Sequence, residues 1–209
     1  MKRSFALYRR FGYRAVTGFL EAGNLPVLAM LDEAQSARHV SGAVAEIGVH
    51  HGRLFIPLQL LQRGAGNAVA IDLFGLQELN VDKSGRGDLD KFLRNVELWS
   101  SSDNLVIHQG DSTKLSPDVL LDRAGGSIRL FSVDGGHTEE IVLSDMRLAE
   151  ATLSDGGIVI ADDVFNQQWP GVVVGTMRYL EDRSGLVPFA IGFNKTFFTQ
   201  PEHAHFYRD

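Results

Sequence analysis

Five short apolar runs constrain the fold of this chain more than any other feature of its sequence. They are VAEIG (44–48), AVAIDLF (68–74), NLVIHQG (104–110), IRLFSVD (128–134) and GIVIAD (157–162). Nearly unbroken apolar runs of this length are typical of strands buried on both faces, as in a parallel sheet. Helical patterns lie between them and after the last run, near residues 52–63, 89–101, 116–123, 138–153 and 170–183. The alternation predicts a doubly wound α/β domain with a mostly parallel sheet.

The two ends of the chain add to this architecture. Residues 1–38 predict two helices separated near Gly23 to Pro26, which we interpret as an N-terminal helical cap. Residues 39–209 then form the main domain. The runs LVPFAIGF and KTFFTQ flank Asn194 without room for a helix, so they predict an antiparallel C-terminal hairpin at one sheet edge. The expected sheet therefore has seven strands.

Charge and composition exclude several classes of protein. The formal net charge of -6 argues against a general nucleic-acid binder, because phosphate neutralisation needs a basic surface. No apolar stretch reaches the roughly 20 residues that span a bilayer, and the basic N-terminus lacks the apolar core of a signal peptide. The absence of cysteine excludes disulfides and thiolate metal sites. We expect a cytoplasmic protein with no membrane span and no nucleic-acid partner.

Unusual polar residues follow the predicted strands, at the edge where open α/β sheets bind ligands. The first strand carries Glu46-x-Gly48-x-x-x-Gly52. The glycines allow a tight turn and the close approach of a ligand, and the helix that follows directs its free N–H groups into the same space. A dinucleotide fingerprint would be G-x-G-x-x-G, which this motif is not. The carboxylate of Glu46 favours a cationic ligand instead.

The second and third strands also end in acids. Asp72 lies 24 residues after Gly48, where an acid can accept both hydroxyls of a ribose. The third strand ends in Gly110-Asp111-Ser112, and an acid next to a small polar residue can bind the edge of an adenine. Taken separately, Asp72 and Asp111 could each be a helix N-cap. Their occurrence on successive strand ends favours a binding site.

The fourth and fifth strands end in Asp134 and in Asp162-Asp163. If these strands are neighbours, about 4.8 Å apart, their terminal carboxylates can share one cation. Three carboxylates without a cation would repel one another and raise their pKa values. Oxygen ligands favour a hard ion, Mg²⁺ or otherwise Ca²⁺ or Mn²⁺. The alternative is that these acids cap the following loop or face solvent.

His137 follows Asp134 by three residues, after a turn made by Gly135 and Gly136. A histidine beside an activated hydroxyl is a suitable general base, because its ordinary pKa is near 6.5. The alternative for His137 is a capping or surface role. For His50 and His51, a structural or solvated role is favoured over a place in the pocket.

The motifs on the first three strands together resemble those of class I S-adenosylmethionine-dependent methyltransferases. Val133-Asp-Gly-Gly-His137, with Gly156-Gly-Ile-Val-Ile-Ala-Asp-Asp163 and Trp169-Pro-Gly-Val, is similar to the macrocin O-methyltransferase group, which methylates sugar hydroxyls. The resemblance covers about residues 40–200. It implies a Rossmann-like methyltransferase fold. One departure is His50, which stands at a variable glycine of the family.

The resemblance also implies roles for the strand-end residues. Glu46, Gly48 and Gly52 would serve the methionine end of S-adenosylmethionine, Asp72 its ribose, and Asp111 with Ser112 its adenine. His137 would be the base, acting with Asp134, and Mg²⁺ would lie on Asp134, Asp162 and Asp163. The acceptor would be a natural-product sugar or an oligosaccharide such as a methylated mannoside from polysaccharide biosynthesis. Related enzymes often self-associate, so a homodimer is expected.

Three other functions remain open from the sequence. A catechol-type phenol O-methyltransferase would use similar acids and Mg²⁺, although the histidine favours an aliphatic alcohol. An iron-dependent hydroxylase needs two histidines and a carboxylate, and only His137 is well placed. An inactive, methyltransferase-like binding protein would have lost these positions. Residues 75–90 could be a lid over the acceptor or a solvated loop, and Asn166, Gln167, Trp169 and Asn194 are expected acceptor contacts.

Overall fold

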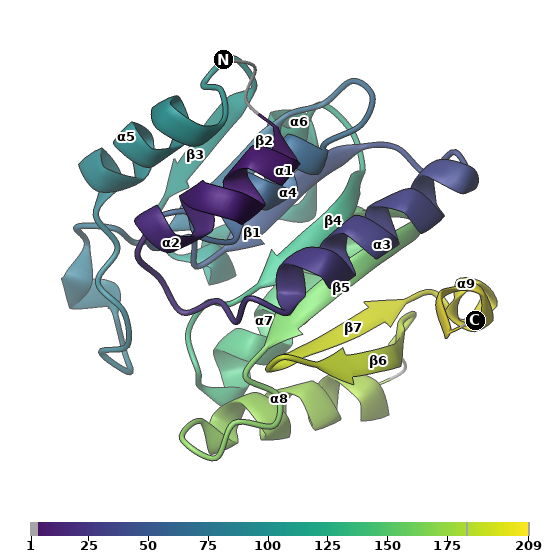
Figure 1. Cartoon of the computed structure of the whole chain (residues 1–209). Helices are drawn as coiled ribbons and strands as arrows, with labels where there is room; N and C mark the ends of the chain where they lie inside the picture. The colour runs from purple at the N-terminus through teal and green to yellow at the C-terminus, as the bar shows by residue number, and fades with distance from the viewer. Residues whose placement is uncertain (1–3, 183, 209) are drawn as a thin grey trace.

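The computed structural model describes residues 4–182 and 184–208, and these form a seven-stranded sheet between two layers of helices (Figure 1). The strands are β1 (Ala43–Ile47), β2 (Ala68–Asp72), β3 (Leu105–Gln109), β4 (Ile128–Val133), β5 (Leu153–Asp162), β6 (Val187–Gly192) and β7 (Lys195–Thr199). Their order is β3-β2-β1-β4-β5-β7-β6. Strands β1 to β5 pair in parallel, whereas β7 is antiparallel to β5 and β6. The predicted mostly parallel sheet with an antiparallel C-terminal hairpin is confirmed.

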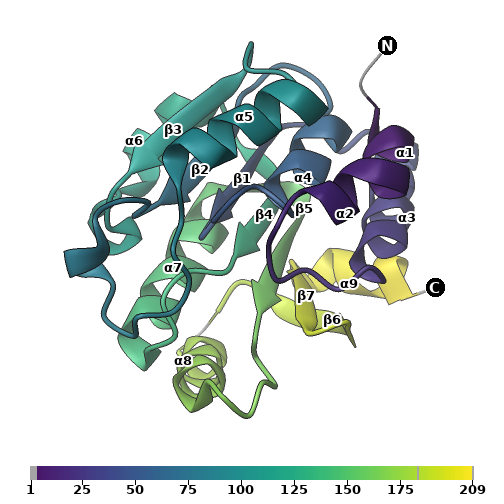
Figure 2. The ribbon, with the colours of Figure 1, turned by 60° about the vertical axis from the view of Figure 1, so that its left-hand side comes forward.

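The helices cover both faces of the sheet. One layer contains α1 (Phe5–Leu7), the π-helical η1 (Tyr8–Gly12), α2 (Tyr13–Ala15), α3 (Asn24–Ala37), α4 (Phe55–Leu61) and α5 (Leu89–Trp99). The other contains α6 (Pro117–Ala124), α7 (Glu139–Thr152) and α8 (Pro170–Glu181). Figure 2 shows the two layers on opposite sides of the strands. The chain is completed by α9 (Pro201–Arg208) and the short 3-10 turns η2 (Gln77–Leu79) and η3 (Ser112–Lys114).

The core is divided between the two faces of the sheet, which explains why the strands are apolar throughout. In β1, Ala45 and Ile47 pack in the cluster with α6, α7 and α8. Val44, which points the opposite way, packs in the cluster with α3, α4 and α5. Successive side chains of a strand alternate between faces, so a strand covered on both sides needs apolar residues at consecutive positions.

The N-terminal segment is anchored to the sheet by a buried ion pair. Two helical stretches are present as expected, and the second, α3, begins at Asn24. Arg129 of β4 is fully buried and donates to Asp32 of α3 over 2.7 Å, and it also bonds the side chain of Gln35. Breaking one side of such a pair leaves an uncompensated buried charge, at a cost of about 3–5 kcal/mol. The domain boundary at residue 38 stays a prediction.

Two further features bear on the expectations from sequence. The short helix α9 was not predicted; it packs beside β6 and β7. Among the described helices, none combines the length and the apolar character that a bilayer crossing requires. The strand order reverses between β1 and β4, and ligands of open α/β sheets bind at such a point.

Candidate active site

A pocket of about 560 Å³ lies at the carboxyl edge of the sheet, where the loops after β1 and β4 meet. These loops come together because β4 pairs with β1 on one side and with β5 on the other. The predicted site residues that line the pocket are Glu46, Gly48, Asp72, Asp111, Ser112, Asp134, His137, Asp162 and Asp163. Of the expected acceptor contacts, Asn166, Trp169 and Asn194 line it, and Gln168 does so in place of Gln167.

The turn after β1 brings two strand ends into direct contact. Gly48 has a φ of 85°, and a Cβ at this position would lie 1.7 Å from the carbonyl oxygen of Asp134. This position therefore requires glycine. Gly52, the predicted site residue outside the pocket lining, turns the chain into α4 and lies against Phe92. His50 has a φ of 51°, in the left-handed region that favours glycine.

Glu46 is a buried carboxylate in the pocket wall. Its residue is 2 % exposed, the Ser132 hydroxyl lies 3.5 Å from one oxygen, and the other oxygen has no hydrogen-bond partner among the described residues. Burial, with repulsion from Asp134, raises the pKa of Glu46 well above its ordinary value. A cationic ligand beside Glu46 would satisfy the free oxygen and favour the ionised form. This fits the positively charged methionine end of S-adenosylmethionine.

Asp72 organises the loops on both sides of its strand. One carboxylate oxygen accepts from the backbone N–H of His50 over 2.7 Å, and the other accepts from that of Phe74 over 2.6 Å. A carboxylate offers about four lone-pair sites, so both oxygens can still accept a ribose hydroxyl. Burial raises the pKa of Asp72, although these two amides oppose the rise. The ribose role stays a prediction.

Asp72→Ala is expected to raise the dissociation constant of S-adenosylmethionine by about 10- to 100-fold, the usual effect of losing hydrogen bonds to a charged group. Calorimetric titration measures this directly. Because the variant also loses two bonds to backbone amides, its melting temperature and circular dichroism must be compared with those of the native chain. An unaltered dissociation constant in a folded Asp72→Ala variant would exclude the ribose assignment.

Asp111, which follows the third strand, caps a helical turn and also lines the pocket. Asp111 caps η3, and one of its oxygens accepts from the backbone N–H and the hydroxyl of Thr113. Ser112 is buried next to it. Both Asp111 and Ser112 also line the pocket, so the capping role and the predicted adenine contact are compatible. The adenine contact stays a prediction.

Asp145 of α7 is a buried acid behind this part of the pocket. It is 1 % exposed, and neither of its carboxylate oxygens has a hydrogen-bond partner of good geometry among the described residues. A Cβ on Gly135 would lie 2.8 Å from Asp145 Oδ2, so this acid supports the turn before His137. Burial raises the pKa of Asp145 to about 7, although the nearby Ser112 hydroxyl opposes the rise.

Asp145→Asn is expected to remove a pH-dependent loss of stability. Because the folded-state pKa of Asp145 is above the unfolded one, the native chain loses stability as pH rises toward 7. Between pH 5 and pH 8 this amounts to about 3 kcal/mol. Denaturant unfolding at both pH values checks it. At pH 8 the free energy of unfolding of the native chain should approach or fall below that of the variant. A parallel pH dependence of this free energy in both proteins would contradict the assignment.

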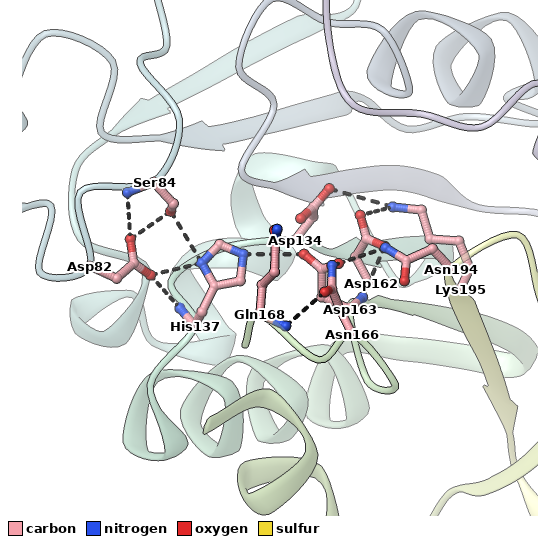
Figure 3. A network of polar contacts seen from close by, with 10 residues as sticks. All are labelled: Asp82, Ser84, Asp134, His137, Asp162, Asp163, Asn166, Gln168, Asn194 and Lys195. Carbon is pink, nitrogen blue, oxygen red and sulfur yellow. Dashed lines mark hydrogen bonds and ion pairs between the residues drawn. The ribbon is translucent and has the colours of Figure 1, made fainter. Parts of the chain in front are cut away.

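Asp134 and Asp162 lie at the ends of neighbouring strands, and the ammonium group of Lys195 lies between them (Figure 3). Lys195 Nζ is 2.5 Å from Asp162 Oδ2 and 3.4 Å from Asp134 Oδ2. Burial alone would lower the pKa of Lys195, but Asp134 and Asp162 raise it, so the side chain is charged. Burial and repulsion from Asp134 raise the pKa of Asp162. Sequence reasoning assigned no role to Lys195.

Asp163 connects this acid pair to His137. Its Oδ2 is 3.3 Å from His137 Nε2, and its Oδ1 accepts from the amides of Asn194 and Asn166 over 2.6 and 2.7 Å. The ring of His137 stacks on Trp169, with centroids 4.1 Å apart. Burial would lower the pKa of His137, but its hydrogen bonds, first to Asp163, outweigh this and raise it.

Asp134 and Asp163 offer carboxylate oxygens, which suit a hard cation. One ligand atom from each of Asp134, His137 and Asp163 lies within 4.8 Å of the other two. The predicted metal ligands were Asp134, Asp162 and Asp163, but Asp162 is paired with Lys195 in this structure. Asp134 and Asp163 belong to both sets. Carboxylates outnumber cations in the cluster even with Lys195 included, so a further positive charge would relieve their repulsion.

Asp82 was also missed by the sequence analysis. It lies in the loop between β2 and α5, within the predicted lid of residues 75–90, and it bonds both the backbone and the ring of His137. The composition of the loop could not indicate this contact, because a polar loop has no periodicity to orient a side chain. Lys195 had a usable signal, since it begins the strand directly after Asn194, an expected pocket residue.

The family of the chain follows from its sequence over residues 45–164, which match the model of a family described as a methyltransferase domain. The match covers more than half of the 209 residues. The chain belongs to this methyltransferase family. The identification of a methyltransferase from the strand-end motifs is thus confirmed. None of the curated proteins matches this methyltransferase significantly.

Solved O-methyltransferase structures share the fold of this methyltransferase. NovP aligns with a TM-score of 0.68 at 16% identity, over 85% of this chain and 79% of that one. CalS11, a TDP-rhamnose 3'-O-methyltransferase of calicheamicin biosynthesis, gives 0.57 at 19% identity, over 85% and 80%. TomG from Streptomyces achromogenes, in complex with SAM, gives 0.61 at 17% identity, over 95% and 89%. The predicted Rossmann-like methyltransferase fold is confirmed.

Proposed function

We propose that this methyltransferase transfers the methyl group of S-adenosylmethionine to a sugar hydroxyl, with His137 as general base and Mg²⁺ beside Asp134 and Asp163. The observation that carries the proposal is the location of His137. Its imidazole lies against a cluster of carboxylates, in the same pocket as Glu46 and Asp72. The methyl donor, the acceptor and a base can therefore meet in one cavity.

The chemistry requires one proton transfer and one methyl transfer. The acceptor oxygen attacks the methyl carbon in line, the carbon–sulfur bond breaks, and its electron pair stays on sulfur as S-adenosylhomocysteine leaves. The hydroxyl proton passes to Nε2 of His137. Nδ1 of this ring is engaged with Asp82 at 2.7 Å, so Nε2 is the nitrogen available to the acceptor. The acceptor hydroxyl would replace Asp163 as the partner of Nε2.

Asp134 and Asp163 would hold Mg²⁺, with a third ligand from Asp162, because both ring nitrogens of His137 are engaged in the proposed mechanism. A bound Mg²⁺ would supply Lewis acidity that lowers the pKa of the acceptor hydroxyl and fixes its position. Oxygen-rich donors and a sequence without cysteine support a hard ion over a soft one. Lys195 offsets the negative charge of Asp162, so the proposed Mg²⁺ site depends mainly on Asp134 and Asp163.

A sugar acceptor is supported by the base and by one of the related structures. An aliphatic hydroxyl has a high pKa and benefits from a histidine base more than a phenol does. CalS11 is described as a TDP-rhamnose 3'-O-methyltransferase. An oligosaccharide such as a methylated mannoside belongs to the same class of acceptors.

The first experiment is calorimetric titration of S-adenosylmethionine into the purified protein, with Mg²⁺ and then with EDTA. Micromolar binding is expected in both cases. A panel of glycosides, free sugars and catechols is then screened for methyl transfer by mass spectrometry. Transfer to sugars that stops in EDTA supports the sugar acceptor and the need for a metal ion. Transfer to catechols alone would overturn the proposal of a sugar acceptor. If S-adenosylmethionine does not bind, the protein would instead be an inactive, methyltransferase-like binding protein.

A further inference from the structure

The loop between β2 and α5 crosses the pocket and contributes to its wall. Asn80, Val81, Ser84 and Gly85 of this loop all line the cavity. Val81 is 71% exposed, so a ligand in the cavity would find apolar surface on the loop to cover. The loop is therefore in place to close over a bound acceptor.

The contact between this loop and His137 is made by Asp82. Oδ2 of Asp82 accepts from the backbone N–H of His137 over 2.6 Å and contacts Nδ1 of its ring over 2.7 Å. Oδ1 accepts from the backbone N–H and the hydroxyl of Ser84 over 2.9 and 2.5 Å. The Ser84 hydroxyl also lies 3.1 Å from His137 Nδ1. Figure 3 shows that Asp82 approaches the ring from the side opposite Asp163.

We propose that Asp82 is a positioning residue, which orients His137 and at the same time fastens the loop over the pocket. By engaging the Nδ1 side, Asp82 leaves Nε2 directed at the acid cluster and the acceptor. Because one carboxylate holds both the ring and the backbone of His137, closure of the loop and alignment of the base are a single event. This inference rests on the proposed function, in which His137 is the base.

The internal geometry of the loop is consistent with this role. Lys83 and Gly85 have φ values of 57° and 55°, which turn the chain sharply on either side of Ser84. The side chain of Asn80 donates to the carbonyl oxygen of Ser84 over 2.7 Å and so closes the turn. The loop thus presents Asp82 from a compact turn.

The kinetic test compares Asp82→Ala, Asp82→Asn and Glu78→Gln. Glu78 is an exposed acid of the same loop with no hydrogen bond or ion pair among the described residues, so it is the matched control. Asp82→Ala is expected to lower kcat about 10- to 100-fold, with the dissociation constant of S-adenosylmethionine nearly unchanged. Asp82→Asn retains an acceptor oxygen and should recover part of the rate. Glu78→Gln should match the native chain.

A second test does not depend on activity. Trypsin cleaves after Lys83 and Arg86, both in this loop. Cleavage there should be several-fold faster in Asp82→Ala than in the native chain and in Glu78→Gln. Unchanged cleavage, or an unchanged kcat in Asp82→Ala, would overturn the inference. If the trypsin result holds while His137→Ala remains fully active, the general-base proposal fails and the loop contact survives.

Discussion

Replacing His137 by alanine is expected to lower kcat by about 100- to 10,000-fold, which is the usual contribution of a general base. The affinity for S-adenosylmethionine should change little, because the residues predicted to bind it lie on or shortly after β1, β2 and β3. In the native enzyme kcat/KM, which reports the free enzyme, should rise with pH through a pKa above 6.5, since the bonds to Asp163 and Asp82 favour the protonated ring. The variant should lose this dependence.

His203→Ala is the matched control for His137→Ala. His203 lies in α9 and pairs with Asp155 near the beginning of β5, at the edge of the sheet opposite the pocket. Its replacement should leave kcat and the pH profile unchanged. A native kcat and pH profile in His137→Ala would remove His137 from the mechanism.

Asp134→Ala is expected to reduce methyl transfer by about 1,000-fold or more while the fold is retained. Asp134 belongs both to the metal ligands predicted from sequence and to the group of possible ligands in the structure. When Asp134 is lost, Lys195 remains as the counter-ion of Asp162. Its loss should also weaken the binding of Mn²⁺, used as a probe for Mg²⁺, by at least about tenfold. Paramagnetic resonance titration of Mn²⁺ measures this without reference to activity.

A second acidic cluster supplies the control for the metal experiment. Asp155, Glu202 and His203 also lie close enough to share an ion, but they are outside the pocket. Asp155→Ala should therefore leave methyl transfer intact and can identify any Mn²⁺ bound at that cluster. Native Mg²⁺-dependent turnover in Asp134→Ala would rule out the metal model.

The parallel part of the fold was predictable because burial on both faces leaves a strong signal in sequence. Each of the five apolar runs became a strand, and the helical patterns that follow these runs became α4 to α8. The C-terminal hairpin was predictable from the two runs that flank Asn194. Helix α9 was missed because its sequence, PEHAHFYR, is short and polar on average.

The site was predictable to the extent that it consists of parallel strand ends. Asp134 and Asp162 both follow apolar runs, and ends of parallel strands share one edge of a sheet. Asp82 and Lys195 do not obey this rule. Asp82 comes from a loop, and Lys195 comes from an antiparallel strand, whose beginning lies at that edge. The homodimer, the cytoplasmic location and Mg²⁺ stay predictions.

The insertion of β7 between β5 and β6 has a consequence for the order of assembly. The ammonium ion between Asp134 and Asp162 comes from a strand that is synthesised more than 30 residues after the second of these acids. Until β7 docks, β1 to β5 can pair, but their carboxylates face one another without this counter-ion. Docking of the last strand therefore completes both the hydrogen bonding of the sheet and the charge balance of the pocket. A nascent chain therefore acquires its complete binding site only after its last strand has been synthesised.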